Sequence, residues 1–367
     1  MIEFEPDSSS LLSSPCTKES SSIRIKVLGV GGAGCNILSR LRCSSLNEIK
    51  FIALDTDRKN LAECKRKKIV QLGENISGGW GTGGDPEIGR QIALEEKSRL
   101  KKILEDADLL LLISGLGKGT GTGISPVTVQ LAKEMNKLVL ALVIFPFYFE
   151  GDEKLSKAKK GLQELEKVAD ALMVVYNDDL LKEKDISLKE GLKKIDGVLE
   201  STVRAISGLF FHPSLIGMGL DFADIKSFLK KRGYMQVAVG KGKGKEAAIN
   251  ALKEAIPSPM QHKVSFEKTK GIILNIRGGK NLLLSQVEKA ASLVKRGISR
   301  EVEFFWGVSV DENLSDEVSL TLITLNSQMH SKREKEEKRK PSQGELNLKI
   351  YEDDDLDIPT FLRKREN

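Results

Sequence analysis

The sequence lacks any apolar segment long enough to cross a membrane. Its longest apolar runs, "LLLLI" (109–113) and "LVLALVIFPF" (138–147), fall well short of the ~20 residues that span a bilayer, and 30% of the 367 residues are charged. Residues 1–22 are rich in serine but have neither the basic start nor the apolar core of a secretory signal. We therefore expect a soluble, cytoplasmic protein without direct membrane insertion, beginning with a disordered N-terminal arm.

Cysteine and histidine are scarce, and neither forms a recognisable site. The four cysteines lie near the N-terminus without the spacing of metal ligands, and the three histidines are far apart in the sequence. These residues are Cys16, Cys35, Cys43, Cys64, His212, His262 and His330. The pattern argues against a disulfide framework, a zinc site and a histidine-based triad, and it predicts reduced thiols.

A concentrated basic surface is also missing. The net charge is +6, but lysine and arginine are spread along the chain. Their densest run, "SKREKEEKRK" (331–340), is mixed with glutamate. Proteins that bind nucleic acid gather basic residues into a patch, so we expect no nucleic-acid partner.

Apolar segments typical of buried strands alternate with helical segments in the first half of the chain. Strands are expected at about 23–30, 49–57, 106–114, 138–147 and 171–178, and the helix that follows the third of them is expected to carry Pro126 in its first turn. This alternation favours an α/β fold with a doubly wound parallel sheet. A long amphipathic helix follows, opened by a capping box of Ser187 and Glu190, and then a smaller α+β unit.

Two glycine-rich loops follow strands of the predicted sheet. "GVGGAG" places Gly29, Gly31 and Gly34 in the G-x-G-x-x-G order, with Asp55 about 20 residues further on, which is the pattern of a dinucleotide fingerprint. "GLGKGTGTG" (115–123) is the second loop, and it is not a Walker A motif because Gly119 follows Lys118. Since adjacent carboxyl ends of parallel strands face one crevice, two amide-rich loops are expected to meet around a single polyphosphate, which suits a mononucleotide better than NAD.

A third glycine-rich stretch, "GGWGTGGDPEIG" (78–89), has two readings. It closes over the same nucleotide pocket, or it is a plain surface loop. The sequence leaves both open.

The second loop carries a resemblance to a known family. "GKGTGTG" (117–123) matches the tubulin signature G-G-G-T-G-[ST]-G except at Lys118. Together with "DTD" (55–57), "FPFYFEG" (145–151), "YNDDLL" (176–181) and "LDFADIK" (220–226), it resembles the FtsZ family, the bacterial tubulin homologues of cell division. The resemblance runs from Ile23 to Leu325 and returns at "DIPTFLRKR" (357–365), which is similar to the family's C-terminal peptide.

The resemblance implies a set of GTP-binding and catalytic residues. Two loops would hold the phosphates and Glu150 the ribose, Asn177 falls on the family's nucleotide-facing asparagine, and Lys154 stands where the family carries an arginine near the nucleotide. The phosphate-binding residues would be Gly31, Gly32, Ala33, Gly34, Cys35, Asn36, Gly117, Lys118, Gly119, Thr120, Gly121 and Thr122. Asp196 would read the guanine, with Gly197 at the position of the family's aspartate. Asp221 and Asp224 would orient water on the nucleotide of the next subunit.

The same resemblance divides the chain into seven parts. They are a disordered arm (1–22), a GTP-binding domain (23–186), a central helix (187–212), a catalytic loop and its following helix (213–232), a C-terminal α+β domain (233–326), a disordered charged linker (327–350) and a partner-binding peptide (351–367). The expected cofactors are GTP or GDP and Mg²⁺. The expected partners are further copies of the chain and, through 351–367, a membrane adaptor or another division protein.

Three functions remain to be separated. The first is a GTPase that polymerises head to tail at the division site and hydrolyses GTP between subunits. The second is a paralogue that copolymerises but hydrolyses GTP slowly. Three departures from the family motivate it: Gly197, Gly219 in place of an asparagine, and a loop 213–221 that is two residues longer than usual. The third is an NAD-dependent oxidoreductase, which the second glycine loop and the lack of a catalytic constellation disfavour.

Overall fold

The computed structural model describes residues 23–41, 49–64, 68–182, 186–211, 220–256, 269–311 and 314–327. The predicted arm 1–22, almost all of the linker, the peptide 351–367, Cys16, Cys43, Gly219 and the three histidines lie outside these residues. None of the helices among the described residues combines the length and the apolar character needed to cross a bilayer.

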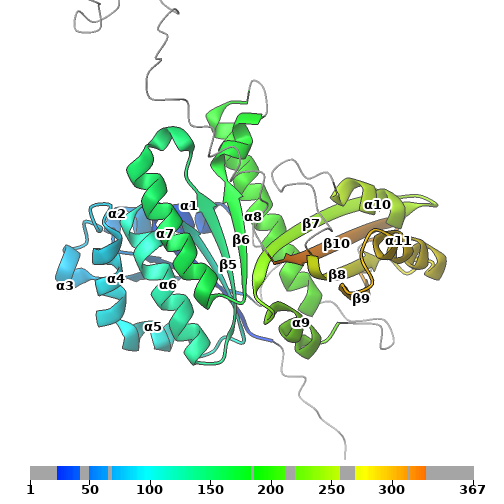
Figure 1. Ribbon diagram of the computed structural model, residues 1–367, viewed down its shortest axis with the longest axis horizontal. Helices are drawn as coiled ribbons and strands as arrows, with labels where there is room; N and C mark the ends of the chain where they lie inside the picture. The colour runs from blue at the N-terminus through cyan, green and yellow to red at the C-terminus, as the bar shows by residue number, and fades with distance from the viewer. Residues whose placement is uncertain are drawn as a thin grey trace, which may run out of the picture. The chain divides into compact units, whose positions relative to one another are not determined.

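A ten-stranded mixed sheet extends through the described residues (Figure 1). Its order is β3-β2-β1-β4-β5-β6-β7-β10-β8-β9, parallel from β3 to β7, with β10 antiparallel to both of its neighbours and β8 parallel to β9. The strands are β1 (Ile25–Val30), β2 (Lys50–Asp55), β3 (Lys68–Gln71), β4 (Leu109–Gly115), β5 (Leu138–Phe145), β6 (Ala171–Tyr176), β7 (Gly233–Lys243), β8 (Thr269–Gly278), β9 (Glu303–Val310) and β10 (Glu317–Asn326). The α/β class with a second α+β part is confirmed. No sequence pattern predicts that β6 and β7 pair over two residues and so make the sheet continuous.

Helices cover both faces of the parallel strands because those strands are apolar on both sides. One apolar cluster joins the sheet to α1 (Gly31–Arg40), α2 (Arg58–Ala62), α8 (Leu188–Phe211) and α9 (Phe222–Leu229). The other joins it to α4 (Pro86–Glu95), α5 (Lys97–Leu104), α6 (Gly119–Glu134) and α7 (Asp152–Val168). Short turns complete this part: α3 (Glu74–Ser77), η1 (Tyr148–Glu150) and η2 (Asn177–Lys182).

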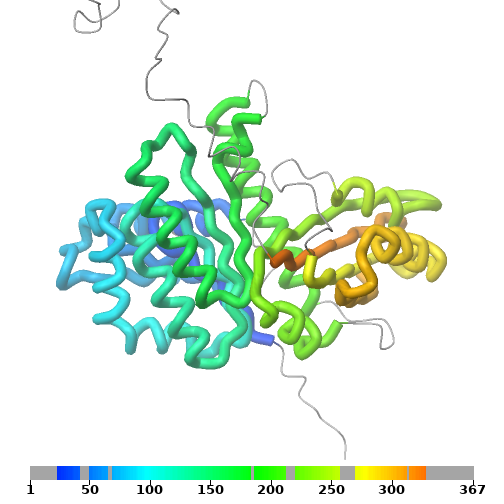
Figure 2. Tube along the Cα trace, viewed as in Figure 1, coloured from blue at the N-terminus to red at the C-terminus, as the bar shows by residue number. Residues whose placement is uncertain are grey.

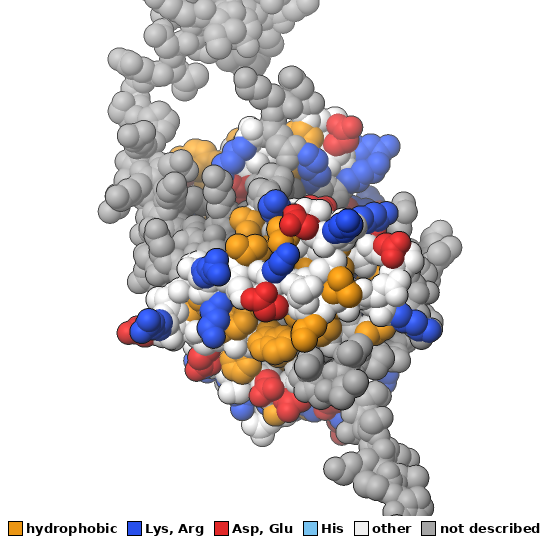
Figure 3. All heavy atoms as spheres, turned by 90° about the vertical axis from the view of Figure 1, so that its right-hand side faces the viewer, with side chains coloured by type: hydrophobic (Ala, Val, Ile, Leu, Met, Phe, Trp, Pro, Cys, Tyr) orange, Lys and Arg blue, Asp and Glu red, His pale blue; other side chains and the backbone are white. Residues whose placement is uncertain are grey.

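The smaller part has a core of its own. It is formed by β7 to β10 with α10 (Ala247–Ala255) and α11 (Leu284–Arg296). Figure 3 views this side, where hydrophobic side chains lie among charged ones, and Leu283, Leu284 and Leu293 are large exposed apolar residues of this part.

The central helix α8 is 24 residues long and starts with the predicted capping box. The Ser187 hydroxyl donates to the Glu190 carboxylate at 2.7 Å, and the Glu190 amide donates back to the Ser187 hydroxyl at 3.3 Å. Leu199 and Val203 are buried as the periodicity predicted, whereas Leu188 in the first turn is 71% exposed. The tube in Figure 2 shows α8 running alongside the parallel strands.

The helix after β4 begins earlier than the sequence predicted. We expected Pro126 in its first turn, but α6 starts at Gly119, so Pro126 lies in the helix interior and that prediction is wrong. The glycines of the loop are themselves the first helical turns. They are needed there for close packing, since a Cβ on Gly123 would lie 2.1 Å from the carbonyl oxygen of Pro86 on α4.

Candidate functional site

A cavity of about 500 Å³ opens at the carboxyl ends of the parallel strands. The sheet register brings Val30, Gly115 and Phe145 to this edge, because Val30 pairs with Ser114 and Gly115 with Ile144. The lining residues are Gly31, Gly32, Ala33, Asn36, Asp55, Asp57, Asn60, Trp80, Gly81, Thr82, Gly83, Gly84, Gly115, Leu116, Lys118, Gly119, Thr120, Gly121, Ile144, Pro146, Glu150, Lys154 and Asn177. Glycine and backbone atoms therefore make up much of its wall.

The two predicted phosphate loops meet in this cavity. A Cβ on Gly31, whose φ is +73°, would lie 3.0 Å from the amide nitrogen of Gly121 in the second loop. A Cβ on Gly121 would lie 2.3 Å from the Gly115 carbonyl oxygen. Only glycine fits such approaches. The prediction that both loops face one pocket is confirmed.

Helix N-termini supply the donors at this edge. Both α1 and α6 start within the glycine loops, and within the described part of the chain neither has a side-chain hydrogen bond capping its N-terminus. The first amide groups of a helix have no partner within the helix and carry a partial positive charge. Two uncapped helix ends at one cavity make a site suited to a polyanion.

The third glycine loop lies against the second one and lines the cavity. A Cβ on Gly119 would lie 1.9 Å from the Thr82 hydroxyl oxygen, so the two loops pack directly together. Gly83 and Gly84 have positive φ values of +61° and +82°. Trp80 is 89% exposed at the rim. Of the two readings of 78–89, the structure supports a loop at the cavity.

Asp55 is the most buried charged group of the lining. Its carboxylate accepts hydrogen bonds from the Thr56 amide at 2.7 Å, the Asp57 amide at 3.2 Å and the Asn60 side chain at 2.9 Å. Burial raises the pKa of Asp55, and these hydrogen bonds oppose the rise. The spacing from the first glycine loop points to Asp55, and Asp57 belongs to the "DTD" motif, but no sequence pattern points to Asn60.

Glu150 and Lys154 reach the cavity from η1 and α7 as a pair. The Lys154 ammonium contacts one oxygen of Glu150, and the other oxygen accepts from the Phe147 amide at 2.9 Å. Asn177 follows β6, and its side-chain oxygen is buried without a hydrogen-bond partner among the described residues. An orphaned acceptor at a cavity indicates a group that a ligand can satisfy.

Five of the predicted binding residues do not line the cavity. Gly34, Cys35, Gly117, Thr122 and Asp196 are absent from its wall. Gly34 packs on the Ile113 carbonyl, and Thr122 accepts a 2.9 Å hydrogen bond from the Gly117 amide, so these residues shape the loops from behind. Burial raises the pKa of the Cys35 thiol, which keeps it protonated.

Asp196 is bound to Arg40. The guanidinium Nε lies 2.6 Å from one carboxylate oxygen of Asp196, and a terminal nitrogen donates to the other at 2.9 Å. This two-point ion pair joins the last turn of α1 to the middle of α8. Beside it, a Cβ on Gly197 would meet no atom of the described residues within 4 Å.

Asp221 and Asp224 lie on α9, outside the cavity wall. The Asp221 carboxylate caps the helix by accepting from the Asp224 amide at 2.7 Å, and both residues are exposed. The rings of Phe210 and Phe222 pack at 5.6 Å and place α9 beside the end of α8. Because α8 has 24 residues, that end lies roughly 36 Å from its start, where Gly191 packs on Leu180 of η2, the turn that begins with the cavity residue Asn177.

Comparison with known proteins agrees with this arrangement. Residues 24–185 match the model of the tubulin/FtsZ family GTPase domain, and residues 233–327 match the model of the FtsZ family C-terminal domain. A cell division protein FtsZ of Buchnera aphidicola is 32% identical over 373 residues, covering 93% of this chain and 96% of that protein. The chain belongs to the FtsZ family. It is therefore a GTPase of the tubulin/FtsZ type, and the cavity lies within its GTPase domain.

Further FtsZ relatives and solved structures extend the comparison. The cell division protein FtsZ of Coxiella burnetii is 32% identical over 345 residues, covering 94% of this chain and 89% of that protein. An empty FtsZ dimer from M. jannaschii superposes with a TM-score of 0.74 at 30% identity, covering 84% of this chain and 89% of that one. A GTPγS-bound protofilament of CetZ2 from Haloferax volcanii has a TM-score of 0.71 at 21% identity, covering 86% and 96%, and shares the fold.

Proposed function

We propose that this FtsZ-family chain binds GTP in the glycine-lined cavity and polymerises head to tail into filaments of the cell-division ring, hydrolysing GTP between subunits. One observation carries the proposal. Asp221 and Asp224 lie beside the far end of α8, roughly 36 Å from the end at which Gly191 packs on Leu180 of η2, and this separation supports action on the nucleotide of a neighbouring subunit. A neighbouring subunit stacked along α8 would bring them to it.

The two glycine loops would hold the phosphates through the amides of α1 and α6. Glu150 would contact the ribose, with Lys154 paired to it, and Asn177 would offer its unpartnered oxygen to the base. Asp196 would read the guanine edge, because a carboxylate accepts both N1–H and N2–H. Its two-point contact with Arg40 would hold it in place until the base arrives.

Mg²⁺ is expected with the nucleotide, and the cavity offers it few ligands. No cluster of three or more acidic, thiol or imidazole side chains that could hold a metal occurs among the described residues. Asp55 is already committed to three hydrogen bonds. The phosphate oxygens and water would therefore supply most of the coordination, and the ion would neutralise phosphate charge.

Hydrolysis would need an oriented water molecule. Asp224 has no hydrogen bond or ion pair through its carboxylate among the described residues, whereas one oxygen of Asp221 caps α9. Asp224 would then accept a hydrogen bond from the water, whose oxygen attacks the γ-phosphorus as the bond to GDP breaks. The slower hydrolysis expected from Gly219 and the longer loop concerns residues outside the described part and stays a prediction.

Head-to-tail contacts use different surfaces on the two partners and produce open filaments. Solved relatives are described as an FtsZ dimer and a CetZ protofilament, which supports self-association. We further propose that residues 351–367 bind a membrane adaptor or another division protein, and that the chain works in the cytoplasm at the division site.

A complementation experiment tests the shared site. Asp224→Asn should lower GTP turnover at least about a hundredfold while GTP binding is retained. Gly121→Val should also be inactive, but because it should fail to bind GTP. Mixing the two should restore part of the turnover, because the intact cavity of one variant meets the intact Asp224 of the other.

The control for the charge change is Glu246→Gln, an exposed acid on the smaller part, which should turn over GTP as the wild type does. Two results would refute the shared site. The first is a GTP turnover per molecule that does not depend on protein concentration. The second is full activity of Asp224→Asn.

A further inference from the structure

Acidic side chains outnumber basic ones in the cavity lining, although a nucleotide is itself negatively charged. One lysine is available to offset the charge of the phosphates. Among the described residues, the charged side chains of the lining are three acids, Asp55, Asp57 and Glu150, and two bases, Lys118 and Lys154. Lys154 is already paired with Glu150. Lys118 is thus the only cation of this lining without an acidic partner in the described part of the chain.

Lys118 occupies the position of its loop where a long side chain fits. Its neighbours cannot carry one: a Cβ on Gly117 would lie 2.9 Å from the Lys154 carbonyl, and one on Gly119 would lie 2.5 Å from the Asp85 carbonyl. Lys118 itself has an extended backbone and an exposed side chain. It stands at the N-cap of α6, a helix of 16 residues. Its ammonium is therefore added to the uncapped amides of that helix end.

A second observation concerns the residues behind and beside this end of α6. The hydroxyl of Ser114 is fully buried at the end of β4, behind the cavity wall, and has no hydrogen-bond partner among the described residues. A Cβ on Gly121 would lie 2.7 Å from that oxygen, so it sits directly beneath the loop. Asn177, which does line the cavity, leaves its buried side-chain oxygen without a partner in the described part of the chain. The cavity wall therefore holds a buried acceptor that a ligand can satisfy, in addition to the unpaired Lys118.

We propose that Lys118 is a built-in counter-ion for the terminal phosphates of the nucleotide. It makes the chain prefer the triphosphate over the diphosphate and the monophosphate, and it reduces the dependence of binding on Mg²⁺. The proposal rests on the function proposed above, that the cavity takes a guanine nucleotide. The physical reason is that an ammonium group attracts each phosphate more strongly as the phosphate charge grows, most of all when no divalent ion screens it.

The experiment measures binding of GTPγS, GDP and GMP to the full chain by equilibrium dialysis, with Mg²⁺ and again with excess EDTA. Lys118→Gln should weaken GTPγS binding about tenfold to thirtyfold in EDTA and less with Mg²⁺. GDP should lose less affinity than GTPγS, and GMP should lose none. Lys118→Arg should restore most of the loss, since it returns the charge.

The matched control is Lys160→Gln, the same change of charge at an exposed lysine of α7 that does not line the cavity. It should bind all three nucleotides as the wild type does. Equal affinities of Lys118→Gln and the wild type in EDTA would overturn the proposal while leaving the function intact. An equal loss for all three nucleotides would also overturn it, because it would mean a structural role. Failure of the wild type to bind any of them would refute the function itself.

Discussion

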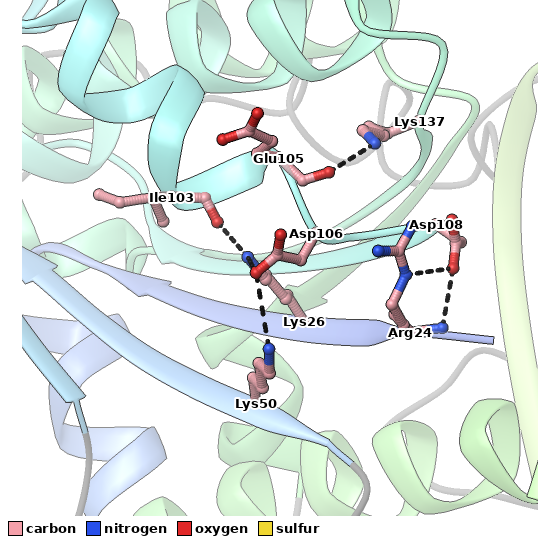
Figure 4. A network of polar contacts seen from close by, with 8 residues as sticks. All are labelled: Arg24, Lys26, Lys50, Ile103, Glu105, Asp106, Asp108 and Lys137. Carbon is pink, nitrogen blue, oxygen red and sulfur yellow. Dashed lines mark hydrogen bonds and ion pairs between the residues drawn. The ribbon is translucent and has the colours of Figure 1, made fainter. Parts of the chain in front are cut away.

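The helix ends at the two edges of the parallel sheet differ in whether their backbone groups are hydrogen-bonded. At the carboxyl end, α1 and α6 begin in glycine loops, and no side chain of the residues that the structure describes caps them. At the amino end, long cations reach the last carbonyls of a helix (Figure 4): Lys26 donates to the Ile103 carbonyl at 2.5 Å, and Lys137 donates to the Glu105 carbonyl at 2.9 Å. The carboxyl end thus leaves helix amides available to a ligand, whereas the amino end pairs helix carbonyls with lysines of the same chain.

The charges at the amino end are likewise satisfied within the chain. Asp106 lies between Lys26 at 3.8 Å and Lys50 at 3.6 Å, and Arg24 binds both oxygens of Asp108. Burial lowers the pKa of Lys26, while Asp106 opposes that effect. The polar groups at the carboxyl end are left unsatisfied and are available to a ligand, whereas those at the amino end are satisfied and stabilise the fold. The same strands thus serve binding at one end and stability at the other.

The largest expected effect is at the carboxyl end. Gly121→Val would place its Cβ 2.3 Å from the Gly115 carbonyl and push the two phosphate loops apart. GTP affinity should fall more than about a hundredfold by isothermal titration, because both loops must hold one phosphate chain. Gly121→Ala should show a smaller loss in the same direction. Wild-type affinity in a folded Gly121→Val protein would show that the loops do not act together.

A change at the amino end should affect stability alone. Lys26→Ala would leave the Ile103 carbonyl without its donor in a buried site, so urea unfolding should show a loss of about 2 kcal/mol. GTP affinity should be unchanged.

Lys50→Ala is the matched control for Lys26→Ala. It removes the other lysine near Asp106, but this side chain is 63% exposed, so the loss should stay within about 0.5 kcal/mol. A change in nucleotide binding by Lys26→Ala at constant stability would contradict the separation of the two ends.

Substitution of Arg40, which pairs with Asp196, tests whether the nucleotide site extends to α8. Arg40→Ala should lower GTP affinity about threefold to tenfold relative to ITP, which lacks the 2-amino group, because Asp196 loses the partner that fixes its two oxygens. Competition binding measures the ratio. Arg40→Lys should recover only part of it, since an ammonium cannot make the same two-point contact. An unchanged GTP-to-ITP ratio would remove Asp196 from the base site.

Patterns in the sequence predicted the strands and the meeting of the glycine loops, for identifiable reasons. Continuous apolar runs such as 109–113 are typical of buried parallel strands, and register then brings their ends together. The predicted start of α6 is too late because the glycine run 115–123 is typical of a loop that ends before its helix begins. Its actual role is close packing against α4, which depends on residues far away in sequence.

Side-chain partners were the part that the sequence could not supply. Nothing in the spacing of Arg40 and Asp196, 156 positions apart, indicates that they meet, and the approach of Asn60 to Asp55 follows from the turn into α2. The predicted roles of Asp221 and Asp224 came from the resemblance. Their placement on α9 depends on the length of α8 and on the packing of Phe210 against Phe222.

The smallest expected effect is a pH dependence at the amino end. Hydrogen bonds and charge from Arg24 hold the pKa of Asp108 below its ordinary value. The ionised form therefore stabilises the fold above the unfolded-state pKa of about 3.9, and this contribution is lost as the pH falls through the lower folded-state pKa. Because both side chains are at least one-third exposed, the wild type should exceed Asp108→Asn by roughly 1 °C in Tm at pH 7. The gap should persist at pH 5 and close between about pH 4 and pH 2. A gap that widened on acidification would mean that Asp108 is stabilised in its protonated form, contrary to its three contacts with Arg24.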